Sequence, residues 1–185
     1  MKTLLTFCGQ RLLLLVMVAS AAFLVSGCKT CKPGQEGKKK PYNIQVNLDP
    51  SLKGKCDVVD LVGVNPASIA RWEEYSMSSY WKEGDPLRRD SKSDRVAFSF
   101  AGTQPLTQTL SIDNAQWAAW AKKGVTHILV LAELPGRHDD KRGNADDRRL
   151  TLPLDECLWA KGTTTLNVLV QQSGIQVTTP PRASK

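Results

Sequence analysis

Eight short segments of the chain are predicted as strands: most alternate apolar and polar residues, as strands with one buried face do, whereas 57–64 and 125–134 are mostly apolar runs. In the first, the apolar residues Tyr42, Ile44, Val46 and Leu48 occupy every second position. The predicted strands span residues 42–48, 57–64, 95–100, 106–112, 125–134, 150–154, 163–171 and 174–179. Because strands and helices do not alternate, we expect a mainly β, antiparallel sandwich of about eight strands with one or two short helices.

Two segments between the strands carry helix signals. Residues 113–124 begin with Asp113 as N-cap and Gln116 three residues later, as in a capping box, and Gly124 closes the segment. Residues 67–81 fit either a helix or an aromatic-rich strand, and the pattern leaves both open. The cluster Gly84-Asp85-Pro86 predicts a turn after them.

The first 27 residues have the order of an export signal, with positive charge at Lys2 and Arg11, an apolar run at 12–25 and then small residues. The apolar run of about 14 residues is shorter than the roughly 20 that span a membrane. The ending Val25-Ser26-Gly27-Cys28 resembles a bacterial lipobox, which implies cleavage before Cys28 and acylation of that cysteine. An ordinary cleaved signal, or an uncleaved anchor, is the alternative.

This interpretation gives a lipoprotein signal peptide (1–27), a lipidated flexible tether (28–41), a β-sandwich domain (42–180) and a frayed tail (181–185). Without the signal, 23 Lys and Arg against 18 Asp and Glu leave a net charge of +5. Much of this excess lies in the tether, at Lys29, Lys32, Lys38, Lys39 and Lys40. Basic residues there favour anionic lipid headgroups, or form a solvated spacer. Export and the lack of aromatic residues among them argue against nucleic-acid binding.

The chain has five cysteines, and their positions along it predict different roles. Cys8 leaves with the signal and Cys28 carries the lipid, so Cys31, Cys56 and Cys157 remain. An exported chain permits disulfides, and Cys56 and Cys157 each adjoin a predicted strand, so we favour that pair. Closing the loop of about 100 residues between them stabilises the fold by up to roughly 4.7 kcal/mol in the chain-entropy model. Cys31 is then free, or available for an intermolecular bond.

Little in the sequence indicates catalysis. His127 lies on an apolar strand and is expected to pack there, while His138 lies in the charged segment 137–149, expected to be a solvated loop of fluctuating ion pairs. No nucleophile-elbow, zinc-helix, phosphate-loop or EF-hand spacing is present. The tryptophans are expected in the core, although an exposed pair such as Trp117 and Trp120 would serve as a partner anchor.

Four stretches together resemble the TssJ family, the outer-membrane lipoproteins of type VI secretion systems: the signal ending at Cys28, the motif at 48–55, the apolar strand 126–134 and the closing segment 150–177. The motif Leu48-Asp49-Pro50-Ser51-Leu52-Lys53-Gly54-Lys55 is similar to that family's Leu-Asn-Pro-Asp-x-x-Gly-Arg loop. Two positions depart from it, Asp for Asn and Ser for Asp, and the tyrosine-leucine pattern expected in the second strand is absent.

The resemblance implies a transthyretin-like sandwich without catalytic activity, cofactor or small-molecule substrate, apart from the covalent lipid on Cys28. It implies attachment to the outer membrane, facing the periplasm, with which Lys29 directly after the cysteine is compatible. It also implies that the loop between the first two strands binds the periplasmic part of TssM, a protein of the inner membrane. Carried over, this partner-binding loop comprises Asp49, Pro50, Ser51, Leu52, Lys53, Gly54 and Lys55.

The residue types of this loop suit contact with a partner. Pro50 limits its conformations, Leu52 offers an apolar anchor, and Lys53 and Lys55 attract an acidic surface. A plain solvated hairpin loop is the alternative. A stand-alone periplasmic ligand-binding lipoprotein, with the tryptophans as a sugar or peptide platform, is the competing function, and an envelope hydrolase has less support.

Overall fold

The computed structural model describes residue 31, residues 36–136 and residues 138–183 of the 185-residue chain. The chain divides into two compact units, Met1–Lys32 and Pro33–Lys185, and the sandwich belongs to the second. The predicted signal peptide and the lipidation site Cys28 lie outside the described residues. In the part that is described, no helix is both long enough and apolar enough to cross a membrane.

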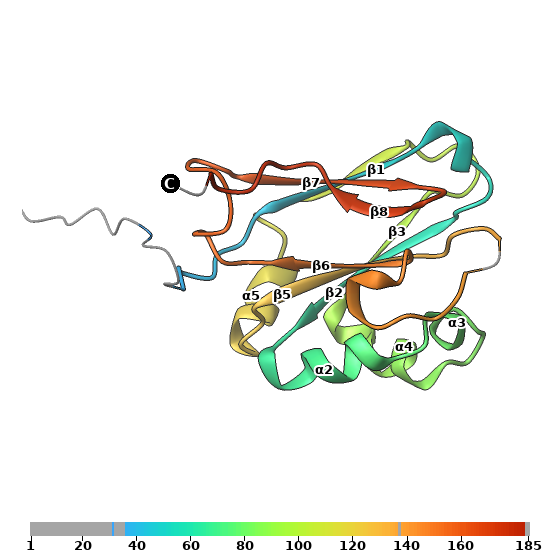
Figure 1. Ribbon diagram of the computed structural model, residues 1–185, viewed down its shortest axis with the longest axis horizontal. Helices are drawn as coiled ribbons and strands as arrows, with labels where there is room; N and C mark the ends of the chain where they lie inside the picture. The colour runs from blue at the N-terminus through green and yellow to red at the C-terminus, as the bar shows by residue number, and fades with distance from the viewer. Residues whose placement is uncertain (1–30, 32–35, 137, 184–185) are drawn as a thin grey trace, which may run out of the picture. The chain divides into compact units, whose positions relative to one another are not determined.

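Eight strands form two four-stranded sheets, as expected for a mainly β sandwich (Figure 1). One sheet has the order β4-β1-β7-β8 and the other the order β3-β2-β5-β6. The strands are β1 (Asn43–Leu48), β2 (Val58–Val64), β3 (Arg95–Ser99), β4 (Thr107–Leu110), β5 (His127–Ala132), β6 (Arg149–Pro153), β7 (Thr165–Gln171) and β8 (Gly174–Val177). Each lies within one or two residues of a segment predicted from the sequence.

One pair departs from the antiparallel expectation. Strands β1 and β7 run parallel, with Ile44 opposite Leu166 and Val46 opposite Val168, so the first sheet is mixed. Alternation could not reveal this, because a half-buried strand has the same period in either direction. Both ends of the domain's chain therefore meet side by side in one sheet.

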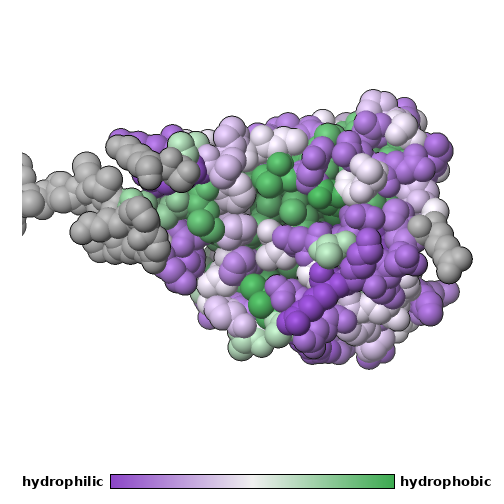
Figure 2. Space-filling model, viewed as in Figure 1, coloured by the Kyte–Doolittle hydropathy of each residue, from purple (hydrophilic) through white to green (hydrophobic). Residues whose placement is uncertain are grey.

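The main core lies between the two sheets and is built from the alternating positions. Tyr42, Ile44 and Val46 on β1 and its approach are fully buried. Partly buried side chains on the edge strands, Leu150 and Ile175, close the core at one side. Figure 2 shows apolar surface along the middle of that view, between more polar surfaces above and below.

Strands β2 and β5 are buried on both faces. One face of β5 packs into the main core, while Leu129 and Leu131 on the other face pack against helices. Each such leucine contributes about 1.5–3 kcal/mol by its burial. This double burial explains why the sequence of β5 is an unbroken apolar run rather than an alternating one.

The covering helices come from the segment between β2 and β3. They are α2 (Pro66–Glu74), α3 (Met77–Tyr80) and α4 (Pro86–Asp90), followed by the 3₁₀ turn η2 (Ser91–Asp94). In Figure 1 they lie together on one side of the sheet that contains β2 and β5. The segment that the pattern left open is thus helical, and α2 begins with a capping box between Asn65 and Ser68.

Helix α4 begins where the sequence predicted only a turn. Asp85 accepts a hydrogen bond from the backbone N–H of Arg88 at 2.8 Å, and Pro86 occupies the first turn. This Asp-Pro pair is a helix start as well as a turn signal, since proline suits the first helical position.

Helix α5 (Gln116–Lys122) confirms the remaining predicted helix but not its cap. The side chain of Asn114, not Asp113, accepts a hydrogen bond from the backbone N–H of Gln116, at 2.9 Å. Gly124, with φ of +66°, ends the helix as predicted. The indole of Trp120 lies so close to Gly63 on β2 that a Cβ there would fall 2.5 Å from it, so this position requires glycine.

Contacts of the domain begin before β1. The backbone N–H of Gly37 donates to the carboxylate of Asp155 at 2.9 Å, and that of Lys40 donates to the carbonyl of Leu154 at 3.2 Å. Residues 37–40, expected in the tether, thus lie against the connection between β6 and β7. At the other end of the chain, Pro181 forms a backbone bridge with Trp159.

Candidate functional site

The loop between β1 and β2 is held in one conformation by its own residues. The Asp49 carboxylate accepts hydrogen bonds from the backbone N–H of Ser51 at 2.8 Å and from its hydroxyl at 2.6 Å. These hydrogen bonds lower the pKa of Asp49, because they favour the charged form. The 3₁₀ turn η1 (Pro50–Leu52) follows, and Gly54 has a positive φ of +70°. The loop is therefore preorganised.

Leu52 is not the apolar anchor that the sequence suggested. Its side chain is 1% exposed and belongs to the main core, with the backbone N–H groups of Lys55 and Cys56 bonded to its carbonyl at 2.9 and 3.0 Å. The prediction that Leu52 contacts a partner is wrong. The residue instead fixes the loop to the sandwich.

The exposed residues of the loop are small or basic: Pro50, Ser51, Lys53, Gly54 and Lys55. Two other connections lie beside it, since the N–H of Leu48 donates to the carbonyl of Leu106 and the N–H of Asp49 to that of Val170. These contacts place the exposed segment 101–105 and the β7–β8 turn at the same end of the sandwich. Any partner that reaches the two lysines meets these loops too.

A buried carboxylate joins the helices to the second sheet. Asp60 on β2 is fully buried and accepts from the hydroxyl of Tyr80 at 2.9 Å. The same oxygen accepts from the guanidinium groups of Arg88 at 3.1 Å and Arg95 at 3.2 Å. Desolvation, followed by the charge of Asp60, raises the pKa of Tyr80, so its hydroxyl stays protonated as a donor. The two arginines pair the charge of Asp60 within the fold, which indicates a structural role, while its other carboxylate oxygen is buried without a hydrogen-bond partner.

The charged segment between β5 and β6 is not a solvated loop of fluctuating pairs. Arg149 is 1% exposed and donates to the backbone carbonyls of Trp72, Tyr75, Lys141 and Gly143.

Arg148 is also buried, and its guanidinium contacts the carboxylates of Asp146 at 2.8 Å and Asp140 at 2.7 Å. These arginines hold the segment against α2 and α3.

Sequence reasoning missed both buried polar groups. Asp60 stands alone in the apolar run Val58-Val59-Asp60-Leu61, and a lone charge in such a run is a signal of a buried pair. The arginines had no comparable signal, because a charged segment is usually solvated.

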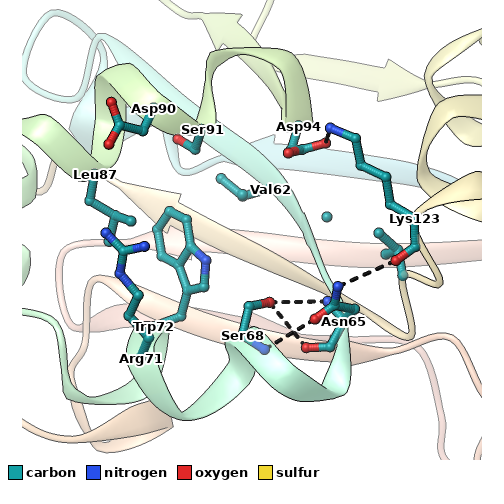
Figure 3. A pocket seen from close by; sticks show the side chains of 12 residues that line it. Val62, Asn65, Ser68, Arg71, Trp72, Leu87, Asp90, Ser91, Asp94 and Lys123 are labelled. Atoms are coloured by element: carbon teal, nitrogen blue, oxygen red, sulfur yellow. Dashed lines mark hydrogen bonds and ion pairs between the residues drawn. The ribbon is translucent and has the colours of Figure 1, made fainter.

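A small pocket opens between α2, α4 and the end of β2 (Figure 3). Its volume is about 220 Å³, below the roughly 300 Å³ at which ligand sites usually begin. Trp72 and Leu87 line it, with Arg71 and Asp90 at its rim. Asp94 is already paired with Lys123 at 2.5 Å. The hydroxyls of Ser68 and Ser91, which line this pocket, donate to the backbone carbonyls of Asn65 and Arg88 at 3.1 and 3.0 Å.

The cysteines pair differently from the prediction. Cys56 is a free, buried thiol, so the predicted bond between Cys56 and Cys157 is wrong. Cys157 and Cys31 are each disulfide-bonded, so the expectation that Cys31 is free is wrong too. Burial raises the pKa of Cys56 to about 11. Adjacency to a strand did not identify the pair, because Cys56 faces the core.

The histidines and tryptophans have packing roles. His127 contacts the Thr126 hydroxyl at 2.9 Å, and burial lowers its pKa. His138 contacts the carbonyl of Pro135 at 3.2 Å. Trp117 and Trp120 are 8% and 1% exposed and pack edge to face in the core, as expected. Among the described residues, no group of three or more His, Cys, Asp or Glu side chains is placed to hold a metal ion.

No family model matches the chain, and no curated protein matches it. Several solved structures are similar. Serratia marcescens Lip, a membrane-bound component of the type VI secretion system, is 14% identical over 77% of this chain and 99% of that chain, with a TM-score of 0.44. The type VI lipoprotein TssJ1 from Pseudomonas aeruginosa is 11% identical over 80% and 100%, also with a TM-score of 0.44.

The TssM C-terminal domain from EAEC is 6% identical over 74% of this chain and 98% of that chain, with a TM-score of 0.48. The TM-scores of the two lipoproteins and of the TssM domain are thus similar. With identities this low and TM-scores below 0.5, these similarities decide neither the family nor the function of the chain.

Proposed function

We propose that this chain is a non-catalytic lipoprotein subunit of a type VI secretion apparatus, of the TssJ kind. Acyl chains on Cys28 attach it to the outer membrane, and the loop at 49–55 binds the periplasmic domain of a TssM-like protein. The export signal, the lipobox and the loop motif in the sequence support this proposal. The sandwich fold, which the structure has, is the fold that the resemblance implies.

One structural observation carries the proposal. The loop is rigid, exposed and placed at the end of β1 opposite the end at which the chain enters the domain. A preorganised loop loses little conformational entropy when it binds. A loop at the end of β1 opposite the chain's entry into the domain is accessible to a partner that rises from another membrane.

Because Leu52 is buried, the proposed interface is electrostatic and polar rather than apolar. Lys53 and Lys55 project beyond the turn and favour an acidic surface on the partner. Exposed charges of this kind act mainly on association rate and specificity, so binding should weaken as salt rises.

The competing function of an aromatic ligand platform has lost its main support. Such a platform needs indole faces open to solvent, whereas Trp72, Trp117 and Trp120 are all at most 8% exposed. Their edges contact packed neighbours within the domain.

The test is binding of the TssM-like periplasmic domain from the same genome to a chain with Lys53→Glu and Lys55→Glu. Reversing both charges should raise the Kd roughly tenfold or more while leaving the melting temperature unchanged. Lys92→Glu is the matched control, because Lys92 is exposed on η2, away from the loop. Equal binding by the loop variant and the control would remove the loop from the proposal, and no binding by the unchanged chain would remove the partner.

A further inference from the structure

The end of the sandwich at which β1 begins contains an apolar recess. The recess has a volume of about 490 Å³ and lies between residues 39–41, helix α5 and the start of β5. Pro41, Ala118 and Ala121 line it and are exposed to solvent. Trp117 and Trp120 form deeper parts of its wall. The recess therefore offers apolar walls that are open to solvent.

Two large apolar side chains stand out at the same end. Leu158 is 49% exposed and Ile112 38% exposed, and they are the exposed large hydrophobic residues of the described chain. The N–H of Ile112 donates to the side chain of Asn43, the first residue of β1, at 2.8 Å. Leu158 lies in the connection that contacts residues 37–40, and its carbonyl accepts from the N–H of Arg182 at 2.9 Å.

The segments that form this end of the domain also carry basic residues, of which Lys39 and Lys40 line the recess. Six Lys or Arg residues belong to this end: Lys38, Lys39, Lys40, Lys122, Lys161 and Arg182. Four carboxylates oppose them: Glu36, Asp113, Asp155 and Glu156. Asp155 is turned inward and bound by Lys39 at 2.9 Å. The sequence before the domain adds Lys29 and Lys32 and no acidic residue back to Cys28, so the excess charge is positive.

We infer that this end is a membrane-docking surface, on which anionic phospholipids are held by the lysines and arginine while Leu158, Ile112 and the recess contact the acyl region. Exposed apolar residues ringed by basic ones are the combination that binds the interface of an anionic bilayer. The inference rests on the proposed lipid anchor and adds the orientation of the domain to it.

Chain length makes docking feasible. Seven residues separate Cys28 from Glu36, where the continuous described domain begins. The eight Cα–Cα steps span at most about 28 Å when fully extended, and the disulfide bond of Cys31 can only shorten this reach. The anchored cysteine therefore keeps this end of the domain within reach of the headgroups.

The loop at 49–55 and the recess lie at opposite ends of β1. Strand β1 has six residues and a length of about 20 Å, and the loop lies at its far end. When the recess end rests on the membrane, the loop faces the periplasm. Docking would thus present the proposed partner-binding surface in a fixed direction rather than on a freely rotating domain.

The test is hydrogen exchange of the full lipoprotein, reconstituted in vesicles of phosphatidylcholine alone or mixed with phosphatidylglycerol. In anionic vesicles, amides of residues 156–161 should exchange about fivefold more slowly than in neutral vesicles, and those of 50–55 should be unchanged. Leu158→Asp with Lys161→Glu should abolish the protection. Lys53→Glu with Lys55→Glu, the same kind of charge change at the other end, should keep it.

Flotation of the same samples separates the two proposals. A chain that floats with both vesicle types but lacks protection at 156–161 keeps its anchor, and the docking surface is then wrong. A chain that does not float has no anchor, and both proposals fall. Protection that appears in detergent and grows with protein concentration would indicate a second copy of the chain as the occupant, which also overturns the lipid assignment.

Discussion

The hydroxyl of Tyr80 on α3 donates a 2.9 Å hydrogen bond to the carboxylate of Asp60 on β2. This contact, with the two arginines on the same carboxylate oxygen, ties the helical segment to a strand that is also part of the main core. The helices are thus a fixed layer of the domain. They cover the outer face of the sheet that contains β2 and β5.

Replacing Asp60 with Asn should destabilise the domain by on the order of 2–3 kcal/mol, because two arginines lose their anion while half-enclosed by the protein. A urea titration monitored by tryptophan fluorescence measures this change. Asp90→Asn is the control, since its carboxylate is 59% exposed and should matter by less than about 0.5 kcal/mol. Equal midpoints for the two variants would show that the Asp60 cluster does not stabilise the fold.

Within the loop at 49–55, the residue that stabilises the fold should differ from the lysines that we propose contact the partner. Leu52→Ala should cost about 2–5 kcal/mol, because it removes a buried side chain and leaves a cavity. Lys53→Ala and Lys55→Ala should each change stability by less than about 0.5 kcal/mol, because both side chains are exposed. Thermal melts of the three variants measure this. A Leu52→Ala domain as stable as the lysine variants would mean that this loop is not fixed by the core.

The thiol of Cys56 should resist alkylation in the folded protein and react after unfolding. It is buried, and its pKa of about 11 leaves very little thiolate near neutral pH. Iodoacetamide labelling with peptide mass spectrometry, with and without urea, measures this directly. Cys56→Ala should leave the disulfide at Cys157 intact, and its loss in that variant would reinstate the pairing that the structure contradicts.

The domain should lose stability in acid partly through Asp140. Burial alone would raise its pKa, but hydrogen bonds from Ser76, Ser78 and Arg148 lower it below the ordinary 3.8. Because the folded pKa is the lower one, this stabilisation is complete above about pH 5 and disappears as pH falls further. Asp140→Asn should be less stable at neutral pH and should lose less stability on acidification. Urea midpoints across about pH 7 to 3 test this, and parallel curves for the variant and the unchanged chain would contradict it.

The sequence predicted all eight strands of the described sandwich, because half-buried strands alternate apolar and polar residues and the doubly buried strands β2 and β5 are apolar runs. It did not predict the parallel pairing of β1 with β7, because period carries no direction. Helix α4 was missed because Asp85-Pro86 signals a turn and a helix start alike.

For the loop, the motif located an exposed and preorganised segment but assigned Leu52 the wrong role. An isolated leucine between polar residues can point outward or plug the core, and only the path of the backbone decides which. The same holds for Cys56, which faces the core as a free thiol, and for Arg148 and Arg149, which bond to Ser78 and Trp72 far along the chain.

The anchor on Cys28 is the premise of both the proposed function and the docking surface. Intact-mass and peptide mass spectrometry of the protein, extracted from the envelope of the cell that makes it, tests this premise most directly. The account predicts a mature chain that begins at Cys28 and carries acyl chains on its thiol and amino group. A chain that begins elsewhere, or an unmodified Cys28, would contradict it.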